Sequence, residues 1–139
     1  MAKREDLIGV WRLVSFTAKD EADVTSEPFG PAPSGRLIYL ADGIMSAHLG
    51  ADDRPPLLDM GASGAERALS AMRSHFSYAG RWRLEGDRVL HDVDMSISPD
   101  WVGAVKARDV AFDGGDMILT DREPGGRLKV GVLRWRRET

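Results

Sequence analysis

The chain of 139 residues contains no cysteine. This absence excludes disulfide bonds, thiolate catalysis and cysteine-based zinc sites, and it suits a reducing compartment. No apolar run approaches the roughly 20 residues that a membrane-spanning helix needs. The charged start MAKRED is also not followed by the apolar segment of a secretory signal. The sequence therefore predicts a cytoplasmic protein without a membrane partner.

A strong excess of one charge is also missing. Nineteen basic and 22 acidic residues leave a formal net charge of −3, so the charge balance does not favour nucleic acid as a partner. The sequence has no nucleotide or nucleophile signature, and we expect no cofactor. A zinc site built from His48, His75 and His91 with Asp92 or Asp94 is disfavoured because the histidines lack HxxxH or HxH spacing. We expect no metal.

Alternation of apolar and polar residues dominates what is present. In LIGVWRLVSFTA, for example, Trp11 and Leu13 share one face and Val10, Val14 and Phe16 the other. Seven further segments show a similar alternation, and most are joined by short turns rich in glycine and aspartate. The turns are expected at 41–43, 85–87, 113–115 and 123–126.

About eight antiparallel strands must hide two sheet edges, and closing the sheet hides both. The pattern therefore predicts an all-β fold, a closed up-and-down barrel formed by a single domain over residues 1–139. A barrel of eight strands leaves room for one small ligand. The fold class thus predicts an internal cavity.

Two segments depart from the strand pattern. Residues 19–35 are rich in proline and glycine, which predicts a loop; its role as a lid or as a tether is left open. The segment 64–76 carries Ala65, Leu69, Met72 and Phe76 at helical spacing, behind a capping box made by Ser63 and Glu66. It predicts one short helix.

Several motifs carry a resemblance to a known family. Gly9-Val10-Trp11 resembles the Gly-x-Trp signature of lipocalins, in which the tryptophan closes one barrel end beneath a basic residue, here Arg134 or Arg136. PFGPAPSGRLIYLADGIMSAHL, PDWVG and LRWRR, in that order, resemble the bacterial and fungal lipocalin-like domain family. The resemblance implies a calycin-type barrel that binds small apolar molecules. Some lipocalin-like proteins act as cofactor-free cyclases or isomerases, and the family pattern carries over no catalytic residues.

His91 is the leading candidate for chemistry. His91 lies on the same strand face as Val89, Val93 and Met95. If this face points inward, Asp92 and Asp94 point into solvent, which costs less free energy than burying unpaired carboxylates. A desolvated imidazole of low pKa can bond a ligand oxygen or act as a general base. The alternative is a core histidine bonded to a neighbouring hydroxyl.

Tyr78 and Trp82 share one face of the preceding strand, where they would grip a ring-bearing ligand. Trp101 is on a loop that would lie at the barrel rim, whereas His48 is expected to point outward and His75 to sit near the mouth. For each aromatic residue the alternative is ordinary core packing. The predicted ligand-binding residues are Tyr39, Met45, Tyr78, Trp82, His91, Met95 and Trp101.

Three functional hypotheses follow. The first is a barrel that binds a small hydrophobic, oxygenated, ring-containing molecule in its cavity. The second is a cofactor-independent isomerase, cyclase or lyase that uses His91 as base and Tyr78 as electrophile. In a third hypothesis, side chains fill the cavity and the surface mediates protein contacts. The sequence leaves open whether the chain forms a homodimer.

Overall fold

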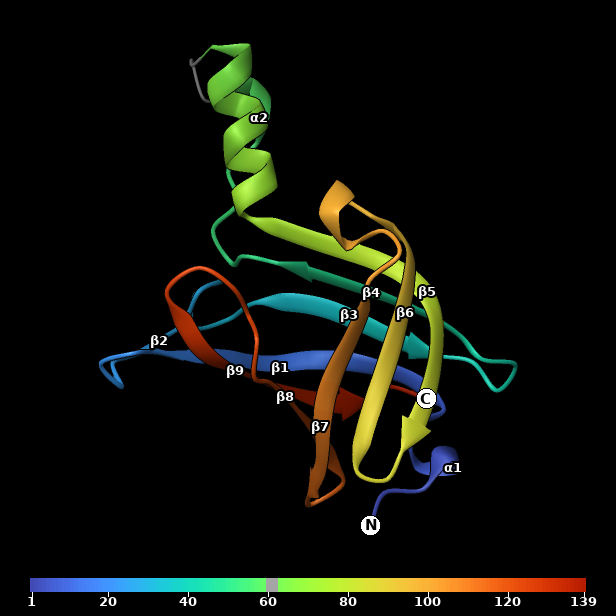
Figure 1. Cartoon of the computed structure of the whole chain (residues 1–139). Helices are drawn as coiled ribbons and strands as arrows, with labels where there is room; N and C mark the ends of the chain where they lie inside the picture. Colours follow the sequence, from blue (N-terminus) through green and yellow to red (C-terminus); the bar gives the residue numbers. More distant parts are fainter. Residues whose placement is uncertain (60–62) are drawn as a thin grey trace.

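Eight antiparallel strands close into a barrel (Figure 1). The structure is a computed structural model that describes residues 1–59 and 63–139. Each barrel strand pairs with the next, and the last pairs with the first, as predicted. A short extra strand, β2 (Thr25–Ser26), pairs with the end of β1. The barrel strands are β1 (Gly9–Asp20), β3 (Ser34–Tyr39), β4 (Ile44–Gly50), β5 (His75–Glu85), β6 (Arg88–Ser96), β7 (Val105–Asp113), β8 (Asp116–Asp121) and β9 (Leu128–Arg137).

The predicted hairpin turns join consecutive strands. Gly43 turns the chain between β3 and β4 with a φ of 97°, and Gly86 does so between β5 and β6 with a φ of 62°. L-residues with side chains rarely adopt these positive values, which explains glycine at both positions. The turns set the strand register, and the register decides which side chains face the interior.

The helices lie at the two ends of the barrel (Figure 1). They are α1 (Arg4–Leu7) and α2 (Gly64–Arg73), accompanied by the 3₁₀ turns η1 (Leu57–Asp59) and η2 (Pro99–Trp101). Alternation and helical spacing did not predict α1, since four residues are too few to show a period. Among the described residues no helix is long and apolar enough to cross a membrane.

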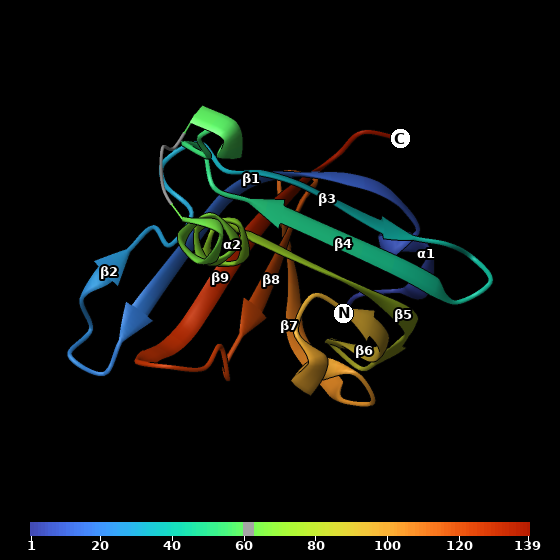
Figure 2. The same cartoon turned by 90° about the horizontal axis from the view of Figure 1, so that it is seen from above.

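Helix α2 is shorter than the predicted 64–76. The Ser63 hydroxyl accepts a hydrogen bond from the backbone of Glu66, as the capping box predicts. The helix ends at Arg73 because Ser74 closes its last turn and Phe76 pairs with β4 in the sheet. Its apolar face does not pack on the barrel: Leu69 is 48% exposed, and α2 stands away from the strands (Figure 1 and Figure 2).

A β-bulge in β6 overturns one prediction. Met95 was expected to face the interior but is 62% exposed. Ala79 of β5 pairs with Met95 whereas Gly80 pairs with Val93, so one extra residue lies between the two pairs. An extra residue reverses the alternation that follows it, and Met95 therefore points outward.

A second bulge, in β1, changes the position of Phe16. Leu13 pairs with Trp135 and Ser15 with Arg134, which leaves Val14 as the extra residue. Phe16 was expected on the face opposite Leu13, and that expectation is wrong because the bulge brings Phe16 to the same interior face. Phe16 lines the barrel cavity.

The N-terminal end of the barrel is closed by Trp11, which is 1% exposed. Its indole nitrogen donates to the Leu7 carbonyl at 2.8 Å. The basic residue above its ring is Arg137, at 4.2 Å from the ring centre, and the expectation of Arg134 or Arg136 is wrong. Arg137 alternates in phase with the buried Trp135, so it faces the same side.

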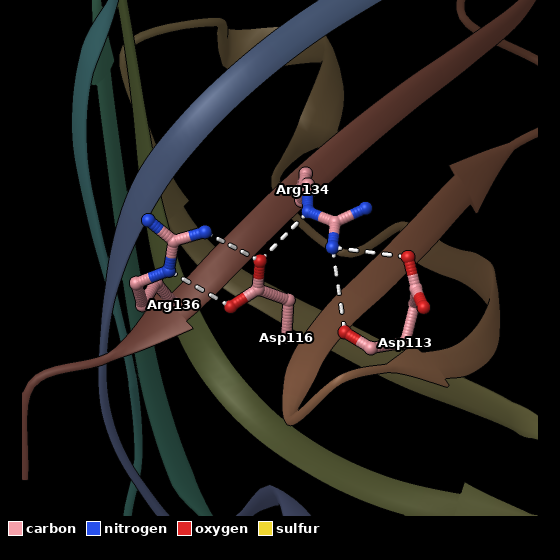
Figure 3. Close-up of polar contacts among 4 residues, drawn as sticks. All are labelled: Asp113, Asp116, Arg134 and Arg136. Carbon is pink, nitrogen blue, oxygen red and sulfur yellow. Dashed lines mark hydrogen bonds and ion pairs between the residues drawn. The ribbon is translucent and has the colours of Figure 1, made fainter.

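Arg134 and Arg136 face outward instead (Figure 3). Arg134 Nε and Arg136 Nη2 lie 2.7 and 2.8 Å from the same oxygen of Asp116, and Arg134 also reaches Asp113. Hydrogen bonds from Arg136 and then Arg134 lower the pKa of Asp116 to about 2. The cluster ties β8 to β9 on the outside of the barrel.

Candidate ligand-binding cavity

The barrel contains a half-enclosed cavity of about 270 Å³. Its lining includes Phe76, just after α2, and Trp101 of η2, so it lies toward the end of the barrel that carries these elements. The wall is mostly apolar, with a few polar side chains, which is the usual composition of a small-molecule site. The prediction of an internal cavity is confirmed. Its aromatic lining residues are Phe16, Phe29, Phe76, Tyr78, Trp101 and Trp135.

Three of these rings form one contiguous wall. The ring centres of Phe76 and Trp101 are 4.6 Å apart, and those of Tyr78 and Trp101 are 5.1 Å apart. Alternation on β5 places Phe76 and Tyr78 on the same face, while η2 brings Trp101 from the rim. The Lys106 ammonium lies 4.3 Å from the Trp101 ring centre and supports it.

The Pro-rich loop contributes a second part of the wall. Pro28 and Phe29 line the cavity, and the Phe29 ring meets Phe16 edge to face at 5.7 Å. The loop is held by Asp52, whose backbone N–H donates to the Phe29 carbonyl at 3.1 Å and whose carboxylate accepts from Ala32. The predicted loop 19–35 is interrupted by β2, and its residues Pro28 and Phe29 form part of the candidate site, a role that the local sequence did not reveal.

His91 faces the interior and is 1% exposed. Its Nε2 lies 2.6 Å from the Tyr39 hydroxyl, and its Nδ1 lies 2.8 Å from the Tyr78 hydroxyl. Tyr39 belongs to β3, His91 to β6 and Tyr78 to β5. Both ring nitrogens are thus engaged with phenols.

Burial keeps these three groups uncharged. Desolvation, aided by the charge of Arg108, lowers the pKa of His91 to about 3. Desolvation also raises the pKa of Tyr78, and it raises that of Tyr39 well above its ordinary value. At neutral pH the cavity therefore presents the neutral imidazole of His91 and the neutral phenol of Tyr78, while the neutral phenol of Tyr39 lies outside the cavity lining.

Sequence reasoning missed a buried ion pair at the cavity. Arg108 and Asp121 both line it, and their charged atoms lie 3.5 Å apart. The two side chains are only 9% and 13% exposed. The signal was available, because Arg108 alternates in phase with Val110 on β7 and Asp121 with Leu119 on β8. When two residues of opposite charge lie on adjacent strands and each shares a strand face with apolar residues, they are expected to form an ion pair that faces the interior.

Three of the predicted ligand-binding residues are buried elsewhere. Tyr39 and Met45 are fully buried and Trp82 is 4% exposed, but none of them lines the cavity. Trp82 donates to the Leu40 carbonyl and lies under Arg4, at the end of the barrel that carries α1. Tyr78, His91 and Trp101 do line the cavity, whereas Met95 faces solvent.

The other two histidines lie outside the cavity lining. His48 is exposed, as predicted, and its ring centre is 5.9 Å from that of His75. His75 begins β5, just after the end of α2. Within residues 1–59 and 63–139, no three histidine or acidic side chains gather so that they could hold a metal ion.

Comparison with known proteins places the chain in a family. A model of the lipocalin-like domain matches residues 8–138. The "4'-hydroxy-3'-methoxypropiophenone carrier protein" of Aspergillus oryzae is 31% identical over 87 residues, which cover 54% of this chain and 78% of that protein. A crystal structure of a mutant of the fluorescent protein UnaG aligns with 98% of this chain and 99% of its own, at 12% identity and a TM-score of 0.41, too low to support an argument. On the family match, the chain belongs to the lipocalin-like domain family.

Proposed function

We propose that this chain binds and carries a small, uncharged, oxygenated aromatic molecule. The observation that supports the proposal is the cavity itself, in which six aromatic side chains line a mainly apolar wall. A relative is named as a carrier of an aryl ketone, which is a molecule of this class. Such a ligand would leave water for an apolar site, and aromatic side chains would provide flat contact surfaces for its ring.

The ion pair supports an uncharged ligand. Arg108 is already paired with Asp121, so the described residues that line the cavity offer no unpaired cation to a carboxylate. Bringing an anion beside Asp121 would add repulsion between like charges in a poorly solvated site. A neutral ligand avoids this cost.

Titration with 4'-hydroxy-3'-methoxypropiophenone tests the proposal, with the fluorescence of Trp101 and Trp135 as the signal because both line the cavity. We expect saturable binding that Leu133→Trp weakens at least tenfold, since the larger side chain fills the cavity. Phe112→Trp is the matched control: it adds an indole at a position that is 40% exposed and outside the cavity lining. Equal binding by both variants would place the ligand elsewhere.

The enzyme hypothesis has one observation in its favour, the contact of Tyr78 with His91 inside the cavity. Two facts oppose His91 as a general base. Both of its ring nitrogens are hydrogen-bonded, and its pKa of about 3 makes it a weak base near neutral pH. Incubating the ketone with the protein and then analysing the ketone by mass spectrometry separates the hypotheses. Recovery of the unchanged ketone supports carriage, whereas a converted product supports catalysis.

A further inference from the structure

The chain of hydrogen bonds through His91 has a direction. At one end, the Tyr39 side chain is completely buried. Within the described part of the chain, its hydroxyl has no hydrogen-bond partner except His91 Nε2. A buried hydroxyl proton without an acceptor is costly. The Tyr39 proton therefore points at Nε2, and Nε2 is the acceptor.

The direction continues to Tyr78. A neutral imidazole carries one N–H, and if Nε2 accepts, that proton is on Nδ1. Nδ1 lies 2.8 Å from the Tyr78 oxygen and donates to it. Tyr78 then accepts from His91, and its own proton is not used in that bond.

The Tyr78 proton is available to a ligand. Tyr78 lines the cavity, whereas Tyr39 does not. The guanidinium of Arg108 acts on Tyr78 but has no acceptor to offer it. In residues 1–59 and 63–139 no hydrogen bond joins Tyr78 to Asp121, the acid at the cavity. One phenolic donor therefore remains free at the cavity wall.

A second donor belongs to Trp135. Its indole nitrogen is buried and has no hydrogen-bond partner among the described residues, and its side chain lines the cavity. An unpaired buried polar group in a folded protein needs an explanation. The Trp135 indole is therefore a second unpaired donor in the lining, but its nitrogen is closed off from solvent, so Tyr78 is the donor that a ligand can reach, while Asp121 is occupied by Arg108.

We infer that the cavity selects ligands that carry an acceptor oxygen such as a ketone carbonyl, with the Tyr78 hydroxyl as the donor and Tyr39 as a positioning residue that acts through His91. The inference rests on the proposed function and names the polar group that the ligand must have. A matched hydrocarbon would leave the Tyr78 donor unpaired. Discrimination by unpaired buried groups is how binding sites reject analogues that lack a polar atom.

The tautomer of His91 is tested without any ligand. In ¹⁵N NMR of the whole protein, we expect protonated Nδ1 and unprotonated Nε2, unchanged from pH 8 to pH 5. A proton on Nε2 would overturn the direction of the chain whatever the protein binds. In Tyr39→Phe, Nε2 loses its donor, so we expect the Nδ1–H signal to lose intensity.

A matched pair of probes tests the ligand class. 2-Acetonaphthone and 2-ethylnaphthalene have similar size and shape, but only the first has a carbonyl. We expect the folded wild-type protein to bind the ketone roughly five times more tightly, the effect of one neutral hydrogen bond. Tyr78→Phe should reduce this preference to about one. Tyr39→Phe should also lower it, although Tyr39 is outside the cavity lining.

Phe76→Leu is the control variant, because it alters the apolar wall and leaves the hydrogen bonds intact. This variant should weaken the binding of both probes and leave the ratio of their affinities unchanged. If the wild-type protein binds the two probes equally, selection by the acceptor is wrong while the proposed function stands. If neither probe binds, the proposed function itself fails. Thermal unfolding of each variant verifies that it is folded.

Discussion

At the scale of single residues, His91 shows how a polar side chain is kept in an apolar interior. Tyr39 and Tyr78 satisfy both of its nitrogens, and burial keeps the ring neutral. A buried imidazole that was charged and unpaired would be far more costly. The neutral state has a consequence for stability that can be measured.

Protonation of His91 should link stability to pH. Its folded pKa of about 3 lies below the ordinary value of 6.5, so between these values the unfolded chain binds more protons. Its contribution is complete above about pH 6.5 and is lost as the pH falls toward 3. In urea unfolding between pH 6 and 4, we expect wild type to lose about 1.4 kcal/mol per pH unit more than His91→Gln. A His91→Gln variant with the same slope as wild type would show that His91 is charged in the folded protein or exposed to solvent.

The pair of Arg108 and Asp121 should decide the charge of the ligand. Asp121→Asn leaves the guanidinium poorly solvated and unpaired, so we expect a loss of about 3 kcal/mol in unfolding free energy. The same variant should bind 2-naphthoate more tightly than 2-acetonaphthone, the reverse of wild type. Calorimetric titration of both probes measures the change.

Asp109→Asn is the matched control, because Asp109 pairs with Arg122 on the outside of the barrel. An exposed pair contributes at most about 1 kcal/mol, and ligand preference should not change. If Asp121→Asn still favours the ketone, Arg108 does not govern the charge of the ligand.

At the scale of secondary structure elements, two bulges decide which side chains meet in the cavity. The bulge in β6 turns Met95 out, and the one in β1 turns Phe16 in. Both are single extra residues in otherwise regular strands. The β6 bulge lies beside Gly80, where the strands approach so closely that a Cβ would lie 1.9 Å from the Asp92 carbonyl oxygen.

Gly80→Ala should therefore be severely destabilising. The methyl group would overlap backbone atoms, which cannot move as a flexible side chain can, and we expect a loss of about 3 kcal/mol. Urea unfolding measures it. Gly64→Ala is the control at the start of α2, where nothing lies within 4 Å of the added atom; it should stabilise by about 0.5 kcal/mol. Equal effects at the two sites would contradict the close approach.

At the scale of the whole molecule, the residues that close the barrel lie toward one end and the cavity lies toward the other. The residues at the closed end are Trp11, Leu7 and Arg137. Arg137 donates to the Ile8 and Asp6 carbonyls, each at 2.7 Å, and so joins the last strand to the start of the chain. Its bonds are charge-assisted and therefore stronger than those of neutral donors.

Arg137→Gln should thus lower the unfolding free energy by about 2 kcal/mol through loss of these bonds. Affinity for 2-acetonaphthone should change less than twofold, because Arg137 does not line the cavity. Urea unfolding and calorimetry measure the two quantities. Arg122→Gln, at a side chain that is 70% exposed, should change neither. A large loss of affinity in Arg137→Gln would show that the two ends are coupled.

The sequence by itself determined the barrel. Alternation, Gly-containing turns and the need to hide sheet edges predicted eight paired strands and a cavity, and the phase of Val89, His91 and Val93 predicted an inward histidine. These features depend on neighbours along the chain, and their periods can be read directly.

Only the tertiary structure decided which side chains meet. The bulge that brings Phe16 into the cavity, the selection of Arg137 over Arg134 at Trp11, and the hydrogen bond of Tyr39 to His91 depend on strands far apart in sequence. One extra residue reverses the direction of every side chain that follows, and no local pattern marks where the partner strand accepts it. Which side chains line the cavity therefore depends on where the bulges shift the register that the turns set.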